Sequence, residues 1–154
     1  MPILHTQFAG QVTNQQGQIV PLAPNVALQS RGPVIQVTVA LAAPFAQGLQ
    51  QGGHTVPAPI SGWALVDTGA SDTCIDAERA QGMGLPAIDV VTMVSASHAA
   101  TQQNVYPIRI EFASVPIVVD APRAMGANLA TQGLLLLIGR DLLHLHVHLQ
   151  WPGG

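Results

Sequence analysis

Proline and glycine interrupt this sequence every few residues, and their spacing limits the chain to short elements. The 154 residues contain 12 prolines and 15 glycines. Because proline breaks the interior of a helix and glycine weakens it, few long helices are expected. Short runs rich in Val, Ile, Leu and Thr lie between these breaks, at 34–41, 63–66, 90–94, 108–112 and 115–119. Many short strands with frequent turns predict an all-β barrel or sandwich.

Helix signals are few. Residues 76–81 can form one or two turns with Asp76 as the N-cap, and residues 139–145 can form one short helix near the carboxyl end. The stretches 1–33 and 43–60 are rich in Gln, Pro and Gly and are expected to be loops or loose edge strands. The length fits one domain. We therefore expect residues 34–154 to form the main part of that domain and residues 1–33 to be its N-terminal extension.

The charge of the chain excludes several functions. It has five arginines, no lysine and eight carboxylates. A basic surface for nucleic acid is therefore not expected, and a Walker phosphate loop, which needs a lysine, is excluded. The single cysteine, Cys74, excludes an intrachain disulfide framework and a cysteine-rich zinc site. Neither a signal peptide nor a membrane span is recognised, so we expect a cytoplasmic protein without a membrane partner.

The strongest functional signal is Asp67. An apolar run, Ala64-Leu65-Val66, leads to this carboxylate, and a Thr-Gly turn follows it. An acid at the end of a buried strand is costly unless it is paired, hydrogen-bonded or protonated, and such costs concentrate at functional sites. The alternative is that Asp67 only caps its own turn through its side chain.

Two motifs together resemble one family. The sequence Asp-Thr-Gly-Ala-Ser at 67–71 resembles the active-site signature of retropepsin-like aspartic proteases, and Leu-Leu-Ile-Gly-Arg-Asp-Leu-Leu at 136–143 resembles the segment that carries their helix. The resemblance implies a closed β-barrel with a flap hairpin around 91–101 and one short helix near the C-terminus. The expected flap tip, Ser95-Ala96-Ser97, lacks the glycines of viral enzymes. It is more similar to the cellular and bacterial branch.

This resemblance implies a homodimeric aspartic endopeptidase. The chemistry needs two carboxylates about 3 Å apart that share one proton. The Asp-Thr-Gly pattern occurs once in the sequence, so the second Asp67 must come from another copy of the chain. The implied partner is an extended peptide of about six to eight residues, bound by backbone hydrogen bonds. Apolar side chains are expected to be preferred around the bond that is cleaved. No cofactor and no metal is implied.

The resemblance also implies a role for each motif residue. Asp67 is the catalytic acid or base, Thr68 bonds to its twin across the dimer axis, and Gly69 leaves space for the substrate backbone. Substrate is expected to contact the groove floor and the flap, at Ala70, Ser71, Asp72, Val94, Ser95 and Ala96.

The helix motif is expected to support the catalytic loop. Gly139 and Arg140 carry this role, and Arg140 should make a charge-assisted bond near the loop. Asp72 is the nearest acidic candidate for this bond. Ser71 stands where viral enzymes carry an acid, which leaves the partner of Arg140 open.

Other readings of the sequence remain. A non-catalytic dimerisation or peptide-binding module could keep the same fold, although the retained Asp-Thr-Gly weighs against it. The alternating histidines His144, His146 and His148 are expected on one face of a terminal strand, as a polar face rather than a metal site. Cys74 is expected to be a buried thiol, and Trp63 to lie in the core or in a subsite wall.

Overall fold

The structure is a computed structural model, and it describes residues 10–95 and 98–148. The chain divides into two compact units, Met1–Val34 and Ile35–Gly154. The first unit contains a hairpin of β1 (Gly10–Thr13) and β2 (Ile19–Leu22), followed by helix α1 (Pro24–Arg31). The side chain of Asn14 organises the hairpin turn, since its Oδ1 accepts hydrogen bonds from the backbone N–H groups of Gln16 and Gln18.

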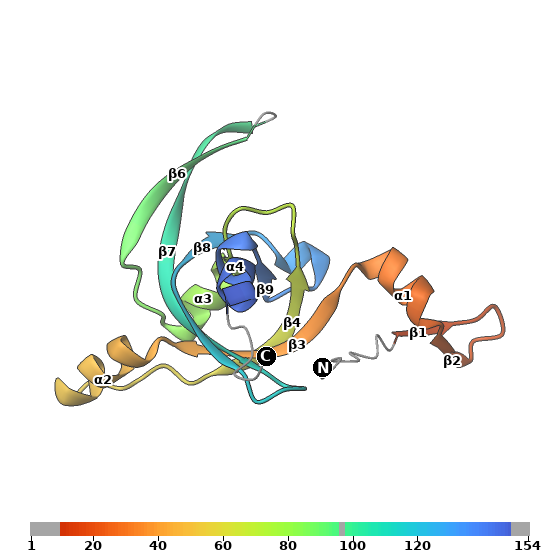
Figure 1. The fold of residues 1–154 in the computed structure, drawn as a ribbon, viewed down its shortest axis with the longest axis horizontal. Helices are drawn as coiled ribbons and strands as arrows, with labels where there is room; N and C mark the ends of the chain where they lie inside the picture. Colours follow the sequence, from red (N-terminus) through yellow and green to blue (C-terminus); the bar gives the residue numbers. More distant parts are fainter. Residues whose placement is uncertain (1–9, 96–97, 149–154) are drawn as a thin grey trace. The chain divides into compact units, whose positions relative to one another are not determined.

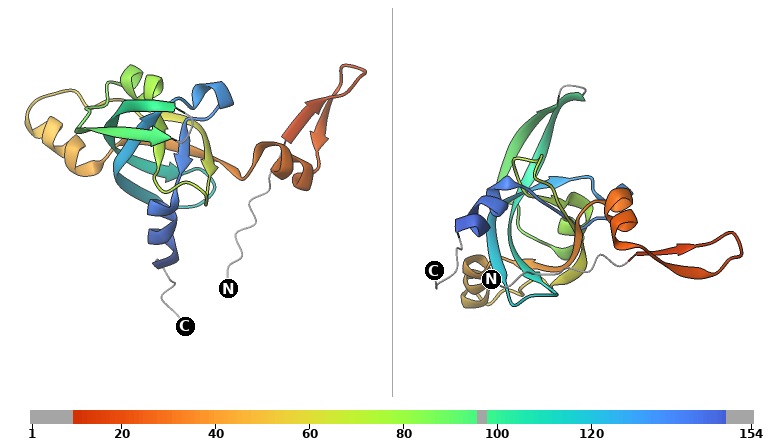
Figure 2. Two further views of the ribbon diagram at one scale, coloured as in Figure 1. Left: turned by 90° about the horizontal axis from the view of Figure 1, so that it is seen from above. Right: turned by 45° about the vertical axis from the view of Figure 1, so that its right-hand side comes forward.

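Six strands of the second unit close into a barrel (Figures 1 and 2). They are hydrogen-bonded in the order β3-β4-β9-β5-β8-β7, and β7 pairs back with β3. A seventh strand, β6, extends the sheet beyond β7. The bounds are β3 (Val34–Leu41), β4 (Ile60–Val66), β5 (Cys74–Asp76), β6 (Asp89–Ser95), β7 (His98–Phe112), β8 (Val118–Ala127) and β9 (Leu136–Ile138). The all-β barrel that the sequence predicts is confirmed.

The core lies inside this barrel. Along β3 the residues Val37, Val39 and Leu41 are buried, and they alternate with more exposed neighbours. Their antiparallel partners on β7 include Ile110 and Ile108, which are fully buried. Burying each such side chain stabilises the fold by about 1.5–3 kcal/mol. The period-2 alternation of the strand therefore fixes which face points inward.

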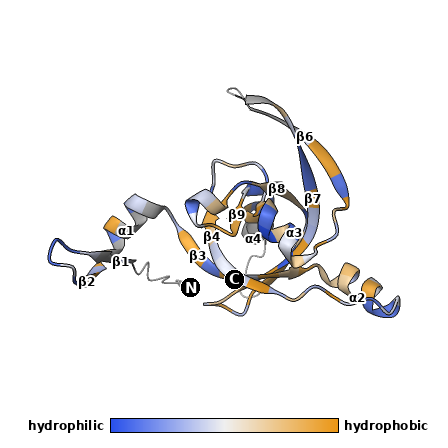
Figure 3. Cartoon of the chain, turned by 180° about the vertical axis from the view of Figure 1, so that it is seen from behind, coloured by the Kyte–Doolittle hydropathy of each residue, from blue (hydrophilic) through white to orange (hydrophobic). Residues whose placement is uncertain are grey.

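The expected flap hairpin is formed by β6 and β7. Their antiparallel register runs from Asp89 opposite Val105 to Ser95 opposite His98. The hairpin projects beyond the barrel (Figure 1). Hydrophobic residues lie along β6 itself (Figure 3). The backbone of Val94 and Ser95 forms the last part of β6, at the far end of the hairpin. Ala96, the third expected flap residue, lies outside the described residues.

Four α-helices and one 3₁₀ turn accompany the strands of the described chain, where the sequence predicted only two helical segments. They are α1, α2 (Ala43–Gln51), α3 (Ala77–Met83), η1 (Ala130–Gln132) and α4 (Arg140–His148). The prediction of loops or edge strands at 24–31 and 43–51 is wrong. Proline lies at the start of both α1 and α2, where it needs no helical partner. Ala46 and Leu49 of α2 also pack against the core, which stabilises a helix of modest propensity.

The α3 helix and the start of α4 follow the predictions. Asp76 caps α3, because its Oδ1 accepts a hydrogen bond from the backbone N–H of Arg79. The predicted terminal strand at 144–148 is wrong, since α4 continues to His148. Leu142 and Leu143 pack the first turn of α4 on the core, and an established helix gains one hydrogen bond for each added residue. The expected polar face of a terminal strand is therefore wrong, because the segment that carries His144, His146 and His148 is helical.

No helix in the described part of the chain is long and apolar enough to span a bilayer.

Candidate active site

The backbone of Asp67 continues a parallel strand pair. Residues 64–66 of β4 lie opposite 136–138 of β9, and the N–H of Asp67 donates to the carbonyl of Ile138 at 3.0 Å. The chain then leaves the sheet in a turn, where the N–H of Ala70 donates to the Asp67 carbonyl at 3.3 Å. The end of β4 therefore fixes the point at which the carboxylate emerges from the barrel wall.

Gly69 orients the Asp67 side chain. The backbone N–H of Gly69 donates to Asp67 Oδ1 at 2.8 Å. A Cβ added at Gly69 would lie 3.1 Å from that same oxygen, which is tighter than usual contact. Asp67 is half-buried, whereas Thr68 and Gly69 are exposed. One carboxylate thus faces the surface in a fixed orientation, and its neighbours are free to meet a substrate or a second chain.

The loop that carries Asp67, residues 67–72 and expected to be the catalytic loop, is held from behind by the start of α4. The N–H groups of Arg140 and Asp141 donate to the carbonyls of Ala70 at 3.0 Å and Ser71 at 3.1 Å. A Cβ on Gly139 would lie only 2.5 Å from the carbonyl carbon and oxygen of Asp72. These two segments therefore pack backbone against backbone, and only glycine fits at 139.

The Arg140 side chain does not bond to Asp72, so that expected pairing is wrong. Its Nη2 donates to Ser71 Oγ at 3.0 Å, and its Nε lies 3.4 Å from the Ala70 carbonyl oxygen. The backbone bond of Arg140 to Ala70 directs the guanidinium along the loop at 70–71, while Asp72 lines a neighbouring cavity. The neutral hydroxyl of Ser71 takes the place of an acid.

Thr73 and Asp141 form a partly buried link that the sequence reasoning missed. Thr73 is completely buried, and its Oγ1 donates to Asp141 Oδ1 at 2.7 Å. The same hydroxyl accepts from the N–H of Gly139 at 3.1 Å. Asp141 Oδ1 also accepts from the N–H of Leu142 at 2.9 Å. The sequence holds one signal for this link. Thr73 and Asp141 are short polar residues that each stand directly before an apolar run.

Asp76 is a buried acid, and its role extends beyond the expected cap of α3. Its Oδ2 accepts hydrogen bonds from the N–H groups of Leu129 at 2.9 Å and Ala130 at 2.8 Å. With the α3 cap, three backbone donors satisfy one carboxylate that is 1% exposed. This side chain therefore anchors the turn before β9, and it is not available for catalysis.

Cys74 is a buried free thiol, as expected. Burial raises its pKa to about 11, and the negative charges of Asp72 and Asp141 add to this effect. Such a thiol stays protonated and unreactive near neutral pH. Trp63 does not lie in the core, which was one of its two expected positions, because 48% of it is exposed.

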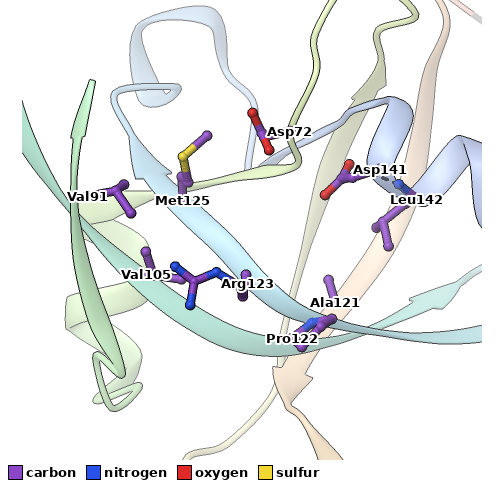
Figure 4. A pocket seen from close by; sticks show the side chains of 9 residues that line it. All are labelled: Asp72, Val91, Val105, Ala121, Pro122, Arg123, Met125, Asp141 and Leu142. Atoms are coloured by element: carbon purple, nitrogen blue, oxygen red, sulfur yellow. Dashed lines mark hydrogen bonds between the residues drawn. The ribbon is translucent and has the colours of Figure 1, made fainter. Parts of the chain in front are cut away.

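A cavity of about 400 Å³ lies between the flap strand and the catalytic loop (Figure 4). In Figure 4, Asp72 and Asp141 lie on one side, and Val91 of β6 lies on the opposite side. Strands β7 and β8 supply most of the wall between them. The full lining is Asp72, Val91, Val105, Ala121, Pro122, Arg123, Met125, Asp141 and Leu142. Within residues 10–95 and 98–148, no three His, Cys, Asp or Glu side chains are grouped so that they could hold a metal ion.

A family model described as Aspartyl protease matches residues 52–142. This range covers more than half of the chain and includes the Asp67 turn, the flap strands and the Gly139 segment. The chain belongs to the aspartyl protease family.

Among solved structures, the chain is similar to the retroviral protease-like domain of Ddi1 from Leishmania major. The identity is 16%, the match covers 74% of this chain and 78% of that chain, and the TM-score is 0.38. No curated protein matches the chain in sequence.

Proposed function

We propose that the chain is an aspartic endopeptidase that acts as a homodimer. The observation that carries the proposal is the fixed, half-buried Asp67 carboxylate at the end of β4, in a chain with a single Asp-Thr-Gly turn. Two such carboxylates brought together by a two-fold axis share one proton, because both cannot ionise cheaply at short distance. In this proposal residues 34–154 form the catalytic domain, residues 1–33 are an extension, and the location is cytoplasmic.

The two Asp67 side chains divide the chemistry. The ionised one takes a proton from a bound water, whose oxygen attacks the carbonyl carbon of the peptide bond. The protonated one donates its proton to the carbonyl oxygen, which gives a tetrahedral diol. The C–N bond then breaks as the proton held by the first carboxyl passes to the leaving amine, and the second carboxylate takes back the proton of one diol hydroxyl as the new carboxyl group forms.

The neighbouring residues position these groups. Thr68 is exposed and can bond to its twin in the partner, and Gly69 leaves room for a substrate backbone. Ala70, Ser71 and Asp72 form the groove floor, and the flap covers the substrate with Val94, Ser95 and Ala96. Gly139 and Arg140 position the loop from behind.

The direct test is cleavage of a mixed peptide pool between pH 4 and 6 by the wild type and by Asp67→Asn. The amide is nearly isosteric with the carboxylate, so the variant is expected to keep its fold, which circular dichroism checks. Cleavage that is lost in Asp67→Asn supports the proposal. Equal cleavage by both proteins, or no cleavage by either, contradicts it, and peptide binding without cleavage identifies a non-catalytic module.

A further inference from the structure

The cavity beside the loop at 67–72 is lined mostly by apolar side chains, and one of its charged groups, Asp72, has no ion-pair partner among the described residues. We propose that it receives a lysine or arginine side chain of the substrate peptide, with Asp72 as the residue that selects it. This inference rests on the proposed function, because it deepens the specificity of the same groove.

The position of the cavity suits a substrate side chain. Asp72 belongs to the same loop as Asp67, and Val91 belongs to the strand of the flap (Figure 4). A peptide lying between loop and flap presents alternate side chains to opposite sides. One of these side chains would therefore enter the space between Asp72 and Val91.

Asp72 is the charge left over in this cavity. The structure gives its exposed carboxylate no hydrogen bond and no ion pair with any described residue. The other carboxylate, Asp141, already accepts at Oδ1 from Thr73 and from Leu142. A ligand group at Asp72 would thus gain an interaction that no group of the described chain makes.

The cationic residue of the cavity, Arg123, already forms an ion pair. Arg123 Nη2 lies 2.6 Å from Oδ2 of Asp89, the first residue of β6. The hydrogen bond from Arg123 holds the pKa of Asp89 below its usual range, so the pair persists at neutral and mildly acidic pH. An acidic substrate side chain would have to displace Asp89, whereas a basic one meets Asp72 directly.

The rest of the lining suits the stem of a long basic residue. Val91, Val105, Ala121, Met125 and Leu142 are apolar. Lysine and arginine place their methylene groups along apolar surface while the charged end reaches a polar partner. The expected selectivity over an uncharged side chain of similar length is about tenfold to a hundredfold, typical of a charge-assisted hydrogen bond.

The experiment uses pools of labelled octapeptides in which one position is fixed as Lys, norleucine or Glu and the other positions are random. Cleavage by the wild type is measured for each position. Binding of the same pools to Asp67→Asn is measured by fluorescence anisotropy, so that selectivity is observed even without turnover. We expect one position at which the Lys pool exceeds the norleucine pool about tenfold or more in both assays, and at which the Glu pool is poorest.

Variants of Asp72 then test the assignment, each made in the wild type for cleavage and in Asp67→Asn for binding. In Asp72→Asn the Lys-to-norleucine ratio at that position is expected to fall close to one, and in Asp72→Lys the Glu pool is expected to become the best. Glu111→Gln, at an exposed acid on β7, changes the net charge equally and should keep the wild-type ratio. Equal binding of all pools, no binding of any pool, or a Lys preference that persists in Asp72→Asn overturns the inference. Absence of cleavage with the binding preference intact counts against the proposed function alone.

Discussion

At the scale of single residues, the Thr73 hydroxyl joins the two motifs of the site. It donates to Asp141 and accepts from the N–H of Gly139, and it is completely buried. Both motifs were recognised from the sequence, but this link between them was not. A buried polar contact depends on two segments meeting in space, and neither segment reveals it alone.

Thr73→Val is expected to lower the free energy of unfolding by about 3 kcal/mol. Valine has the shape of threonine, but it leaves the Asp141 carboxylate short of a donor and the Gly139 N–H without its acceptor. Urea unfolding followed by circular dichroism measures the change. Thr73→Ser keeps the hydroxyl and should lose only about 1 kcal/mol with its methyl group. Equal losses in both variants would show that the hydroxyl is not what stabilises this junction.

Cys74 is expected to react slowly with alkylating agents in the folded protein. Burial, together with Asp72 and Asp141, raises its pKa from 9.0 to about 11, so at pH 8 the folded thiolate population should be about 100-fold below that of the unfolded chain. Because the folded pKa is the higher one, its contribution to stability is complete below pH 9 and is lost as the pH rises toward about 11. Iodoacetamide labelling at pH 8, with and without urea, measures the first effect. Comparable labelling rates in the two conditions would contradict the burial of this thiol.

At the scale of elements, the junction of the Asp67 loop, residues 67–72, with α4 defines the candidate site. Backbone hydrogen bonds join residues 70–71 to residues 140–141, and Gly139 lies against the backbone of Asp72. The helix therefore acts as a support for the loop rather than as a separate unit. Any side chain at 139 must push the two segments apart.

Gly139→Ala is expected to destabilise the protein by about 3 kcal/mol and to reduce peptide cleavage strongly. The added Cβ would lie 2.5 Å from backbone atoms of Asp72, and backbone cannot move aside as a flexible side chain can. Thermal unfolding and cleavage of the peptide pool measure the two effects. The matched control is Gly48→Ala in α2, where no atom lies within 4 Å and a gain of about 0.5 kcal/mol is expected. Similar stability of the two variants would contradict the close packing at Gly139.

The helices show where sequence reasoning about elements succeeds and where it does not. The cap of α3 is a local signal, and Asp76 was identified from it. Helix α2 has no buried residue and no side-chain cap, and it depends on contacts of Ala46 and Leu49 with a distant core. The alternating histidine segment has the period of a strand, but the helix that begins at Arg140 extends through it. Tertiary packing decided these two segments against their local pattern.

At the scale of the whole molecule, one chain supplies half of the proposed catalytic pair. The described residues place a single Asp67 at the end of β4, and the barrel, flap and supporting helix are all present in one copy. The remaining requirement is a second copy whose Asp67 lies within a few ångströms of the first.

Mixing wild-type subunits with Asp67→Asn subunits should therefore lower the activity by more than the fall in the wild-type fraction alone. If subunits exchange freely and both carboxylates are needed, activity follows the square of the wild-type fraction, so an equal mixture retains about one quarter of the dimers as active pairs. Cleavage rates at constant total protein measure this dependence. A linear fall to one half would show that each subunit works alone, and sedimentation of both proteins controls for a change in assembly.

The sequence by itself determined the strand-rich fold, the family and the position of the Asp67 carboxylate. Strand alternation, turn residues and the two short motifs are properties of neighbouring residues, and they are readable without coordinates. Only the tertiary structure decided that Arg140 bonds to Ser71, that Thr73 is bound to Asp141, and that α2 and the end of α4 are helical. Each of these features depends on contacts between segments far apart in the chain, and their geometry is set only when the barrel closes.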